Sequence, residues 1–600
     1  MRIAAWVLAL ALTGAGTVHA QAGYLDQEAL TRALRSITNG SDLATLRSLG
    51  KSTEGRDIWL VEIGRRSGAA LDTRPGLLVV GNLEGDHLAG SAMAVEAIRH
   101  LLSAEGRAAA ADVLANNVIY VVPRLNPDGA QAMFARVRTG QRTNARPVDD
   151  DNDGRLDEDP GEDLNGDGMI TLMRVPDPAG DYLVDAGDAR LMRRADRSKG
   201  EAGAFRVYRE GRDTDHDGLY NEDGPGGVDL NRNFQHAYPY WNADAGPWIV
   251  SEPESRALMD FTIAHRNIAA ILTFGLSDNL VVPPNDRGVL ANAAVLTMGT
   301  FADAANREAL TRGVFRVAGA GGGFGGRGPG GGGGGAGPQL RGAQPGRDND
   351  SASGQRPNTT VHRNDRGYYS RVSALYRELT GITKVGVNRE AEGAFFQYGY
   401  YQFGVPSFST PGWGHARTAR DSSLDITMLA VLDSAHVAAF VNWTPFTHPE
   451  LGAVEIGGFD PYAVINPPAD SLAALGAKHG AFIARLAGLL PRVRIAATEV
   501  TNHGGGVFTV KVTVENAGYF PTALQQGVAA RAVAATTVQI QVPPESVLTG
   551  ANKTHRIARL EGSGAREEVS WVIRGRQGAT VEIRVRAQKG GTATSTVTLR

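Results

Sequence analysis

Two hydrophobic patterns alternate through the first half of the chain. Short apolar runs bounded by glycine and proline, such as "RDIWLVEIG" (Arg56–Gly64) and "PGLLVVGN" (Pro75–Asn82), predict buried strands. The segment "AGSAMAVEAIRHLLSA" (Ala89–Ala104) places apolar residues at helical spacing, and "NNVIYVVPRLNPDG" predicts a strand ending in a turn. This alternation over residues 24 to about 316 predicts an α/β fold with a mostly parallel or mixed sheet.

The last part of the chain, about Arg492 to Arg600, has a different pattern. Runs such as "VFTVKVTVEN", "TTVQIQVP" and "ATVEIRVRAQ" alternate apolar and polar residues and are separated by turn signals. Short alternating strands of this kind predict a small β-sandwich. We expect it to be an accessory domain, with a partner that the sequence does not identify.

Between about Ala318 and Asn358 the chain is dominated by glycine, in "GGGFGGRGPGGGGGGAG" and its flanks. A segment with so little to bury predicts a flexible insertion. Its arginines are few, which gives little support to nucleic-acid binding. Structured sequence resumes at "RGYYSRVSALYREL" and continues to about Leu490, so that residues 24–490 form the expected α/β domain.

The amino-acid composition limits which partners and which metal ligands are candidates. The 600 residues carry a formal net charge of −3, so no overall field favours nucleic acid or anionic lipid. There are no cysteines, which leaves His, Asp and Glu as candidate metal ligands.

The N-terminus, "MRIAAWVLALALTGAGTVHA", has the pattern of a signal peptide. Arg2 precedes a short apolar stretch, Ala4 to Leu12, and Val18 and Ala20 suit cleavage ahead of Gln21. A membrane span needs about 20 apolar residues, and the sequence offers no such stretch. We therefore expect residues 1–20 to be removed from a periplasmic or secreted protein.

A possible metal motif follows the strand at Pro75–Asn82. "GNLEGDH" places Glu84 three residues before His87 in a glycine-containing turn. A carboxylate and an imidazole at this spacing can hold a metal ion, but zinc peptidase motifs of this type run His first and Glu second.

Further motifs occur in the order typical of one family. "GNLEGDH", "PRLNPDG" (Pro123–Gly129), "GVDLNRNF" (Gly227–Phe234) and "SEPESRAL" (Ser251–Leu258) resemble those of zinc carboxypeptidases of the carboxypeptidase A type. The resemblance covers about Leu25 to Leu490. It implies an α/β/α sandwich with a twisted mixed sheet whose strand ends carry the site.

In that family an Asn–Arg pair and another Arg hold the carboxylate of the substrate's C-terminus. Asn231 and Arg232 match the pair, and Arg138 and Arg142 are both possible second arginines. A guanidinium fork suits bidentate carboxylate recognition. The alternative is that Arg232 pairs with a nearby acidic loop. By resemblance, Tyr398, Tyr400 and Tyr401 are candidates for a substrate-covering tyrosine.

The zinc and catalytic positions depart from the family. Glu84 and His87 are swapped, and the position of the third zinc ligand is Gly275, or Phe274 if the alignment shifts by one. The position of the general base, a Glu in the family, is Pro411. The resemblance implies zinc, but these substitutions predict impaired or absent hydrolysis. His415 could supply a replacement ligand, with His362 and His236 as further possibilities.

Three acidic segments repeat a second pattern, in which acidic or amide side chains alternate and are followed by glycine. Oxygen clusters of this kind favour calcium, and the glycine permits a tight turn. None has the Glu at position twelve of an EF-hand loop, so we expect structural calcium loops without the helical hand. The candidate ligands are Asp149, Asp151 and Asp153, then Asp163, Asn165 and Asp167, and finally Asp213, Asp215 and Asp217.

Three functions stay open from the sequence. The chain is either a non-hydrolysing carboxypeptidase relative that binds a peptide-like ligand by its free carboxylate, or an active metallocarboxypeptidase with a rearranged zinc site. The third possibility is a structural or surface-attachment protein.

Overall fold

The computed structural model describes most of the chain outside its N-terminus and the glycine-rich region. The described residues are 23–149, 154–216, 218, 220–221, 226–240, 242–285, 360–389, 391–414, 424–434, 436–550 and 552–600. The predicted signal peptide and glycine-rich insertion, together with Asp151, Asp153, Asp217 and His415, lie outside them.

The central element is a six-stranded mixed sheet with the strand order β1-β2-β4-β3-β9-β10. The pairs β1–β2 and β2–β4 are antiparallel, whereas β4, β3, β9 and β10 run parallel. The four parallel strands β3, β4, β9 and β10 are buried along their whole length, as strands covered on both faces must be. The strands are β1 (Ala44–Lys51), β2 (Asp57–Ile63), β3 (Gly76–Gly81), β4 (Val118–Val122), β9 (Ile268–Phe274) and β10 (Ser407–Thr410).

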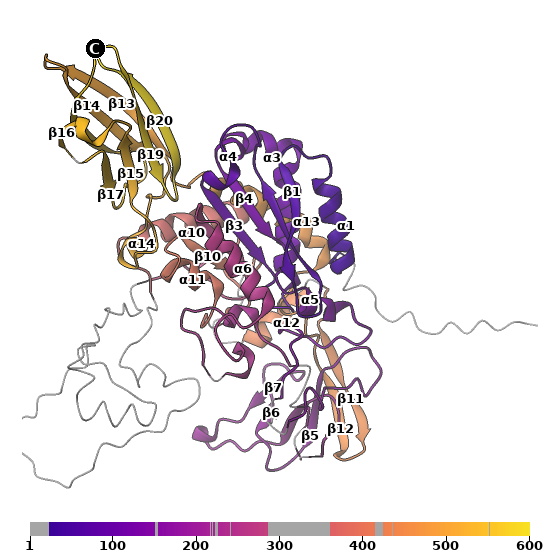
Figure 1. The fold of residues 1–600 in the computed structure, drawn as a ribbon. Helices are drawn as coiled ribbons and strands as arrows, with labels where there is room; N and C mark the ends of the chain where they lie inside the picture. The colour runs from indigo at the N-terminus through magenta and orange to yellow at the C-terminus, as the bar shows by residue number, and fades with distance from the viewer. Residues whose placement is uncertain are drawn as a thin grey trace, which may run out of the picture.

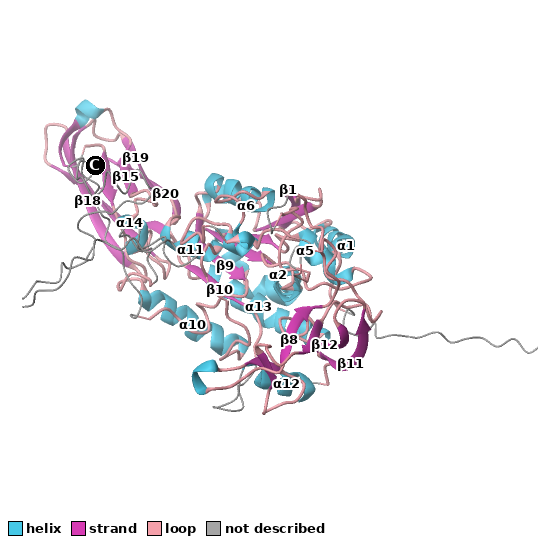
Figure 2. Cartoon of the chain, turned by 90° about the horizontal axis from the view of Figure 1, so that it is seen from below, coloured by secondary structure: helices cyan, strands magenta, loops and turns pink. Residues whose placement is uncertain are grey.

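Helices cover both faces of this sheet, so the predicted α/β/α sandwich is confirmed. Seen from below, β9 and β10 lie between α6 and α11 on one side and α10 and α13 on the other (Figure 2). One core packs against α1, α2, α10 and α13, and the other against α6 and α11. Their bounds are α1 (Gln27–Thr38), α2 (Leu88–Leu102), α6 (Pro253–Ala264), α10 (Arg366–Thr380), α11 (Phe395–Tyr401) and α13 (Leu472–Ala487). The shorter helices are α3 (Ala104–Ala109), α4 (Ala111–Asn116), α5 (Pro127–Gln131) and α12 (Leu424–Ser434).

A second six-stranded sheet, which the sequence analysis did not predict, lies below the α/β sandwich in Figure 1. Its order is β11-β12-β5-β8-β6-β7, and every pairing is antiparallel. It joins the region between the "NPDG" and "DLNRNF" motifs to a hairpin that follows α12. The strands are β5 (Leu172–Pro176), β6 (Tyr182–Val184), β7 (Met192–Arg194), β8 (Phe205–Arg209), β11 (Phe440–His448) and β12 (Gly452–Phe459).

The C-terminal region forms two four-stranded antiparallel sheets, which confirms the predicted β-sandwich. Their orders are β13-β14-β18-β16 and β17-β15-β19-β20, and both sheets contribute to one core around Trp571. The strands are β13 (Val493–Asn502), β14 (Val507–Asn516), β15 (Thr536–Ile540), β16 (Val547–Gly550), β17 (Thr554–Ile557), β18 (Ala565–Arg574), β19 (Thr580–Ala587) and β20 (Gly591–Thr598).

Specific contacts attach this sandwich to the α/β domain. The buried carboxylate of Asp365 accepts hydrogen bonds from the backbone N–H groups of Gln525 and Gln526, at the start of α14 (Gln525–Ala529). Lys589 is also buried, and its ammonium group donates to the carbonyl of Arg266 at 2.9 Å. The accessory domain therefore packs directly against the domain that carries the motifs.

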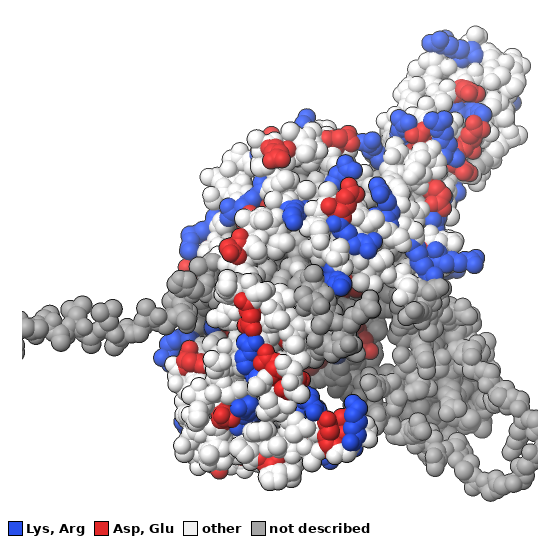
Figure 3. Space-filling model, turned by 180° about the vertical axis from the view of Figure 1, so that it is seen from behind, with Lys and Arg blue, Asp and Glu red and all other residues white. Residues whose placement is uncertain are grey.

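The surface charges are mixed. On the face shown in Figure 3, Lys and Arg side chains are interspersed with Asp and Glu. In the described part of the chain, no helix combines the length and the apolar character that a membrane crossing requires.

Candidate functional site

The zinc-motif positions meet at the carboxyl ends of the parallel strands. Glu84 follows β3, Gly275 follows β9 and Pro411 follows β10. A Cβ atom placed on Gly275 would lie 3.3 Å from Oε2 of Glu84. The imidazole of His87 lies 3.0 Å from the carbonyl oxygen of Pro411. The structure therefore brings together the four positions at which the sequence departs from the family.

Asn82 shapes the loop between β3 and α2. Its backbone has a positive φ of 54°, and its buried side-chain amide donates to the carbonyls of Glu84, Gly85 and His87. Asn is among the few non-glycine residues that tolerate this conformation. Gly85 lies against Gly129 of the "NPDG" motif, where an added Cβ would come within 2.7 Å of backbone.

Glu84 is buried, with 2% of its surface exposed. Its Oε1 accepts a hydrogen bond from the side-chain amide of Asn231 at 2.9 Å and another from the backbone N–H of Leu276 at 3.1 Å. The Glu84 carboxylate, at the first position of the zinc motif, is thus held by Asn231, the residue that by resemblance binds the carboxylate of the substrate.

His87 is fully buried as the residue preceding α2. Its Nε2 lies 3.0 Å from the carbonyl oxygen of Pro411, and the tautomer protonated at Nε2 donates to that oxygen. The other nitrogen, Nδ1, faces the backbone carbonyl of Phe274 next to Gly90. Burial lowers the pKa of His87 to about 4, so the imidazole is neutral near pH 7.

These residues do not fit a catalytic zinc ion. Such a site needs three protein ligands, yet the two ring nitrogens of His87 face the backbone carbonyls of Pro411 and Phe274, and Gly275 has no side-chain donor. Within the described residues, no three His, Asp or Glu side chains are arranged to hold a metal ion. Of the possible replacements, His236 stacks on Tyr401 with ring centroids 3.8 Å apart, and Nδ1 of His362 accepts from the N–H of Asn364.

Asn231 and Arg232 lie in a 3-10 turn, η4 (Leu230–Arg232), which is capped by the side chain of Asp229. Oδ1 of Asn231 accepts from the N–H of Phe395 at the start of α11. The Asn231 amide therefore bridges Glu84 and α11. Nε of Arg232 lies 3.1 Å from Oδ1 of Asp244, so the pairing of Arg232 with a nearby acidic residue is present.

The two candidate second arginines occupy different surroundings. Nη2 of Arg142 is 2.6 Å from Oδ2 of Asp244, and its Nε is 3.1 Å from Asp229. Arg138 instead pairs with Asp460 at 3.1 Å. Arg142 therefore lies beside the Asn231–Arg232 turn, whereas Arg138 joins the second acidic loop to the end of β12.

Sequence reasoning missed Arg389. Its Nη2 lies 3.3 Å from the buried carboxylate of Asp86. Burial alone would lower the pKa of Arg389, but the carboxylates of Asp86, Glu84 and Asp229 outweigh it and raise the pKa above its usual value. The segment "VGVNREAEG" around it carries no motif, and only the fold brings it to the site.

Asn144 was missed as well. It is fully buried, and its side-chain amide donates to Glu252 at 2.9 Å and to Glu254 at 3.2 Å. Its Oδ1 accepts from the N–H of Val228, just before Asp229. Asn144 thus ties the segment containing Arg142 to both the "DLNRNF" and the "SEPESRAL" motifs.

The site contains one more carboxylate than guanidinium group. Burial and the nearby Glu84 charge raise the pKa of Asp229 to about 7, while Arg142 opposes that shift. Burial likewise raises the pKa of Asp86, against the effect of Arg389. The carboxylates are those of Glu84, Asp86, Asp229 and Asp244, and the guanidinium groups are those of Arg142, Arg232 and Arg389.

The candidate tyrosines are buried. Tyr398, Tyr400 and Tyr401 lie on α11 and are each at most 9% exposed. The hydroxyl of Tyr400 donates to Asp365, toward the accessory domain. In this structure they pack in the core.

The described residues of the three acidic loops share one hydrogen bond. In each, Oδ2 of the first Asp accepts a hydrogen bond of 2.9–3.0 Å from the N–H of the glycine five residues later, and that glycine has a positive φ of 84–95°. The pairs are Asp149 with Gly154, Asp163 with Gly168 and Asp213 with Gly218.

Buried carboxylates tie the loops to each other and to the second sheet. Asp159 accepts from the N–H groups of Thr214 and Asn221 in the third loop. Glu210, fully buried, accepts from the N–H groups of Leu164, Asn165 and Thr171.

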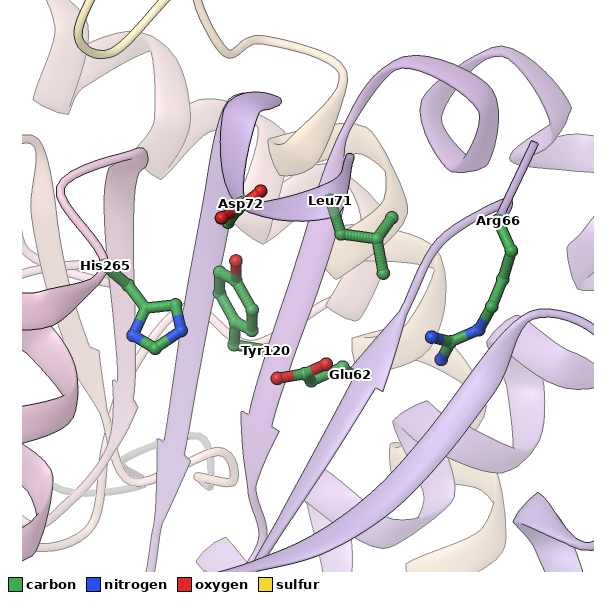
Figure 4. Close-up of a pocket in the computed structure, with 6 residues that line it drawn as sticks. All are labelled: Glu62, Arg66, Leu71, Asp72, Tyr120 and His265. Atoms are coloured by element: carbon green, nitrogen blue, oxygen red, sulfur yellow. The ribbon is translucent and has the colours of Figure 1, made fainter. Parts of the chain in front are cut away.

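A separate pocket lies at the other end of the central sheet, where the parallel strands β3 and β9 begin. It has a volume of about 320 Å³ and is lined by residues that precede β3 and β9 or lie on β2 and β4 (Figure 4). They are Glu62, Arg66, Leu71, Asp72, Tyr120 and His265. None of the sequence motifs reaches it, so it is distinct from the site at the carboxyl ends.

Comparison with known families separates the two parts of the chain. Residues 30–167 match the family described as zinc carboxypeptidase. Over this segment the chain is similar to the zinc carboxypeptidases. The sequence resemblance is therefore confirmed. Residues 492–598 match a family described as Domain of unknown function (DUF8731).

The curated relatives that the chain resembles include carboxypeptidases. The chain is 29% identical to carboxypeptidase SOL1 of Arabidopsis thaliana over 129 residues, which are 21% of this chain and 25% of that protein. It is 30% identical to carboxypeptidase M of Mus musculus over 112 residues, 18% of this chain and 25% of that protein. The chain thus spans about a quarter of the length of these relatives.

Solved structures that align with the chain are more distant in sequence. Thrombin activatable fibrinolysis inhibitor aligns with a TM-score of 0.26 at 14% identity, covering 42% of this chain and 48% of its own. Carboxypeptidase A from Helicoverpa armigera aligns with a TM-score of 0.25 at 19% identity, covering 42% and 47%.

Proposed function

We propose that this chain is an exported member of the zinc carboxypeptidase family that does not hydrolyse peptides. It binds a peptide-like ligand through the free carboxylate at the ligand's C-terminus. One observation carries the binding proposal: Arg142 and Arg232, from separate segments of the chain, point their guanidinium groups at the same carboxylate, that of Asp244. Two converging guanidinium groups form a receptor for a carboxylate.

The site remains open to solvent at this point. The side chains of Arg142, Arg232 and Asp244 are 35%, 17% and 28% exposed. Asn231 is already engaged by Glu84, so the proposed ligand contacts are the two arginines rather than the Asn–Arg pair.

The proposal of no hydrolysis rests on the residues at the reacting positions. Peptide hydrolysis in this family needs a metal-bound water and a carboxylate base. Pro411 provides only its backbone carbonyl, which accepts from His87. Glu84 is held by Asn231 and Leu276.

Calorimetry with a matched pair of peptides tests the function. The probe is N-acetyl-Ala-Ala-Phe with a free C-terminus, and its C-terminal amide is the comparison. We expect the free acid to bind at least tenfold more tightly, and Arg232→Ala to remove that preference. Arg197→Ala is the control, because Arg197 also forms an ion pair with an Asp but lies on the second sheet's connecting turn.

Equal binding of the acid and the amide would overturn the ligand proposal. Release of phenylalanine from the free-acid peptide, measured by chromatography, would overturn the proposal of no hydrolysis and favour a rearranged metal site. Mass spectrometry of the exported protein tests the proposed cleavage ahead of Gln21.

We also propose that calcium binds the acidic loops and stiffens the second sheet beside the site. The support is the repeated Asp–Gly hydrogen bond in all three loops together with their alternating oxygen side chains.

A further inference from the structure

We infer that Asp244 is an internal competitor for the ligand's carboxylate: its side chain must leave Arg142 and Arg232 before a ligand can bind there. This inference rests on the proposed function. It assigns to Asp244 the role of setting how tightly, and at what ligand concentration, the site is occupied.

The geometry of Asp244 matches that of a bound carboxylate. Each of its oxygens faces a different arginine, Oδ2 at 2.6 Å from Arg142 and Oδ1 at 3.1 Å from Arg232. A ligand carboxylate that bridges the same two groups would need the same space. The two carboxylates therefore exclude each other.

Charge leads to the same conclusion. With Asp244 in place, the carboxylates of the site already outnumber its guanidinium groups, so a second anion would enter without a free positive charge. Even at a site open to solvent, a further anion beside this excess of carboxylates is repelled. If Asp244 turns away into water, the ligand carboxylate replaces it and the local charge is unchanged.

Asp244 is the carboxylate best placed to move. Its side chain is 28% exposed, whereas those of Asp86 and Asp229 are 5% and 4% exposed and Glu84 is held by two hydrogen bonds. The backbone of η5 (Ala243–Ala245) is fixed, because the carbonyl of Asp244 accepts from the N–H of Asp229 and that of Ala245 accepts from Asn233. A side-chain rotation is therefore sufficient to free the arginines.

The test is calorimetry of Asp244→Asn with N-acetyl-Ala-Ala-Phe as free acid and as amide. Asparagine has nearly the same shape but no charge, and it leaves the backbone contact with Asp229 intact. We expect the free acid to bind Asp244→Asn about tenfold more tightly than wild type, in the range of a charge-assisted hydrogen bond. Binding of the amide should not change.

Two further variants make the result specific. Asp433→Asn is the control, because Asp433 also pairs with an arginine, Arg190 at 2.7 Å, but lies on α12 and is 47% exposed. The double variant Asp244→Asn/Arg232→Ala should lose the gain. Circular dichroism and the melting temperature show whether each variant is folded.

The outcomes separate the inference from the function on which it rests. If wild type prefers the free acid, Arg232→Ala abolishes that preference and folded Asp244→Asn binds no more tightly, the inference fails and the proposed function stands. If neither wild type nor folded Asp244→Asn distinguishes the acid from the amide, both fail. Binding by Asp244→Asn alone supports the inference.

Discussion

The side-chain amide of Asn231 donates a 2.9 Å hydrogen bond to Oε1 of Glu84, joining the residue that matches the family's carboxylate-binding Asn to the residue at its first zinc-ligand position. Because Oε1 also accepts from Leu276, the Glu at position 84 is part of the folded structure of the site. Glu84 therefore takes part in an internal hydrogen-bond network with Asn231 and Leu276.

Substitution of Glu84 tests this structural role. In Glu84→Ala, the buried donors of Asn231 and Leu276 lose their acceptor, at about 1–3 kcal/mol for each unsatisfied group. We expect the free energy of unfolding to fall by about 2–4 kcal/mol. Glu84→Gln keeps the acceptor and should stay within about 1 kcal/mol of wild type.

Urea unfolding measures both variants. Glu105→Ala, an exposed glutamate at the start of α3, is the control for loss of a surface carboxylate. An Ala variant as stable as the Gln variant would show that these hydrogen bonds contribute nothing.

The central sheet and the C-terminal β-sandwich could be predicted from the sequence because the patterns that indicate their strands are local. Apolar runs of β-branched residues identified the buried strands β3 and β9, and alternating residues identified the sandwich strands β14 and β19. Parallel strands bring the residues that follow them to one edge, which is why Glu84, Gly275 and Pro411 meet as expected.

The remaining parts depend on pairings between distant segments. The second sheet joins Leu172 to Gly457, and neither segment alone signals its partner. Asp244 lies in a turn without a motif, and Arg389 comes from a loop whose sequence matches nothing in the family pattern. The choice between Arg138 and Arg142 likewise needed their carboxylate partners, Asp460 and Asp244.

Displacement of Asp244 predicts a ligand affinity that changes little with pH. Burial, and then the charge of Glu84, raise the pKa of Asp229 to about 7, and the charge of Asp244 acts in the same direction. Because the ligand carboxylate replaces that of Asp244, the pKa of Asp229 should be nearly the same in the free protein and in the complex, so no proton is taken up on binding. If Asp244 stayed in place, the added anion would raise this pKa further, and the affinity would decrease as the pH rises above about 7.

Calorimetry with the free-acid peptide from pH 6 to 9 measures this dependence. Asp229→Asn removes the titrating group while keeping an oxygen for the N–H of Asn231. Wild type and Asp229→Asn should therefore show the same flat profile. A wild-type affinity that falls above pH 7 and becomes flat in Asp229→Asn would contradict the displacement of Asp244.

Restoring the family residues should create a zinc site. A Cβ at position 275 would lie 3.3 Å from Oε2 of Glu84, so side chains at positions 84 and 275 can reach one ion. We expect Glu84→His/His87→Glu/Gly275→His to retain about one zinc per chain after gel filtration, since three protein ligands suffice. It should not hydrolyse peptides, because Pro411 still offers no base.

Elemental analysis measures the zinc content. The double variant Glu84→His/His87→Glu, which keeps Gly275, is the matched control and should bind at least tenfold more weakly. Stoichiometric zinc in wild type, lost in His87→Ala, would contradict the assignment of His87 to Pro411 and favour the rearranged metal site.

Calcium should raise the melting temperature if the acidic loops bind it. A ligand present at 100 times its dissociation constant stabilises the folded state by about 2.7 kcal/mol, and the loops are joined to the second sheet by Asp159 and Glu210. Comparison of the melting temperature in calcium and in chelator gives the shift for wild type.

The double variant Asp163→Asn/Asp213→Asn keeps the oxygens that accept from Gly168 and Gly218 but removes two charges, so its calcium-induced shift should be smaller. Asp42→Asn, at an exposed loop position, is the control and should show the wild-type shift. An equal shift in all three proteins would place calcium elsewhere, and no shift in wild type would exclude a structural role for calcium in these loops.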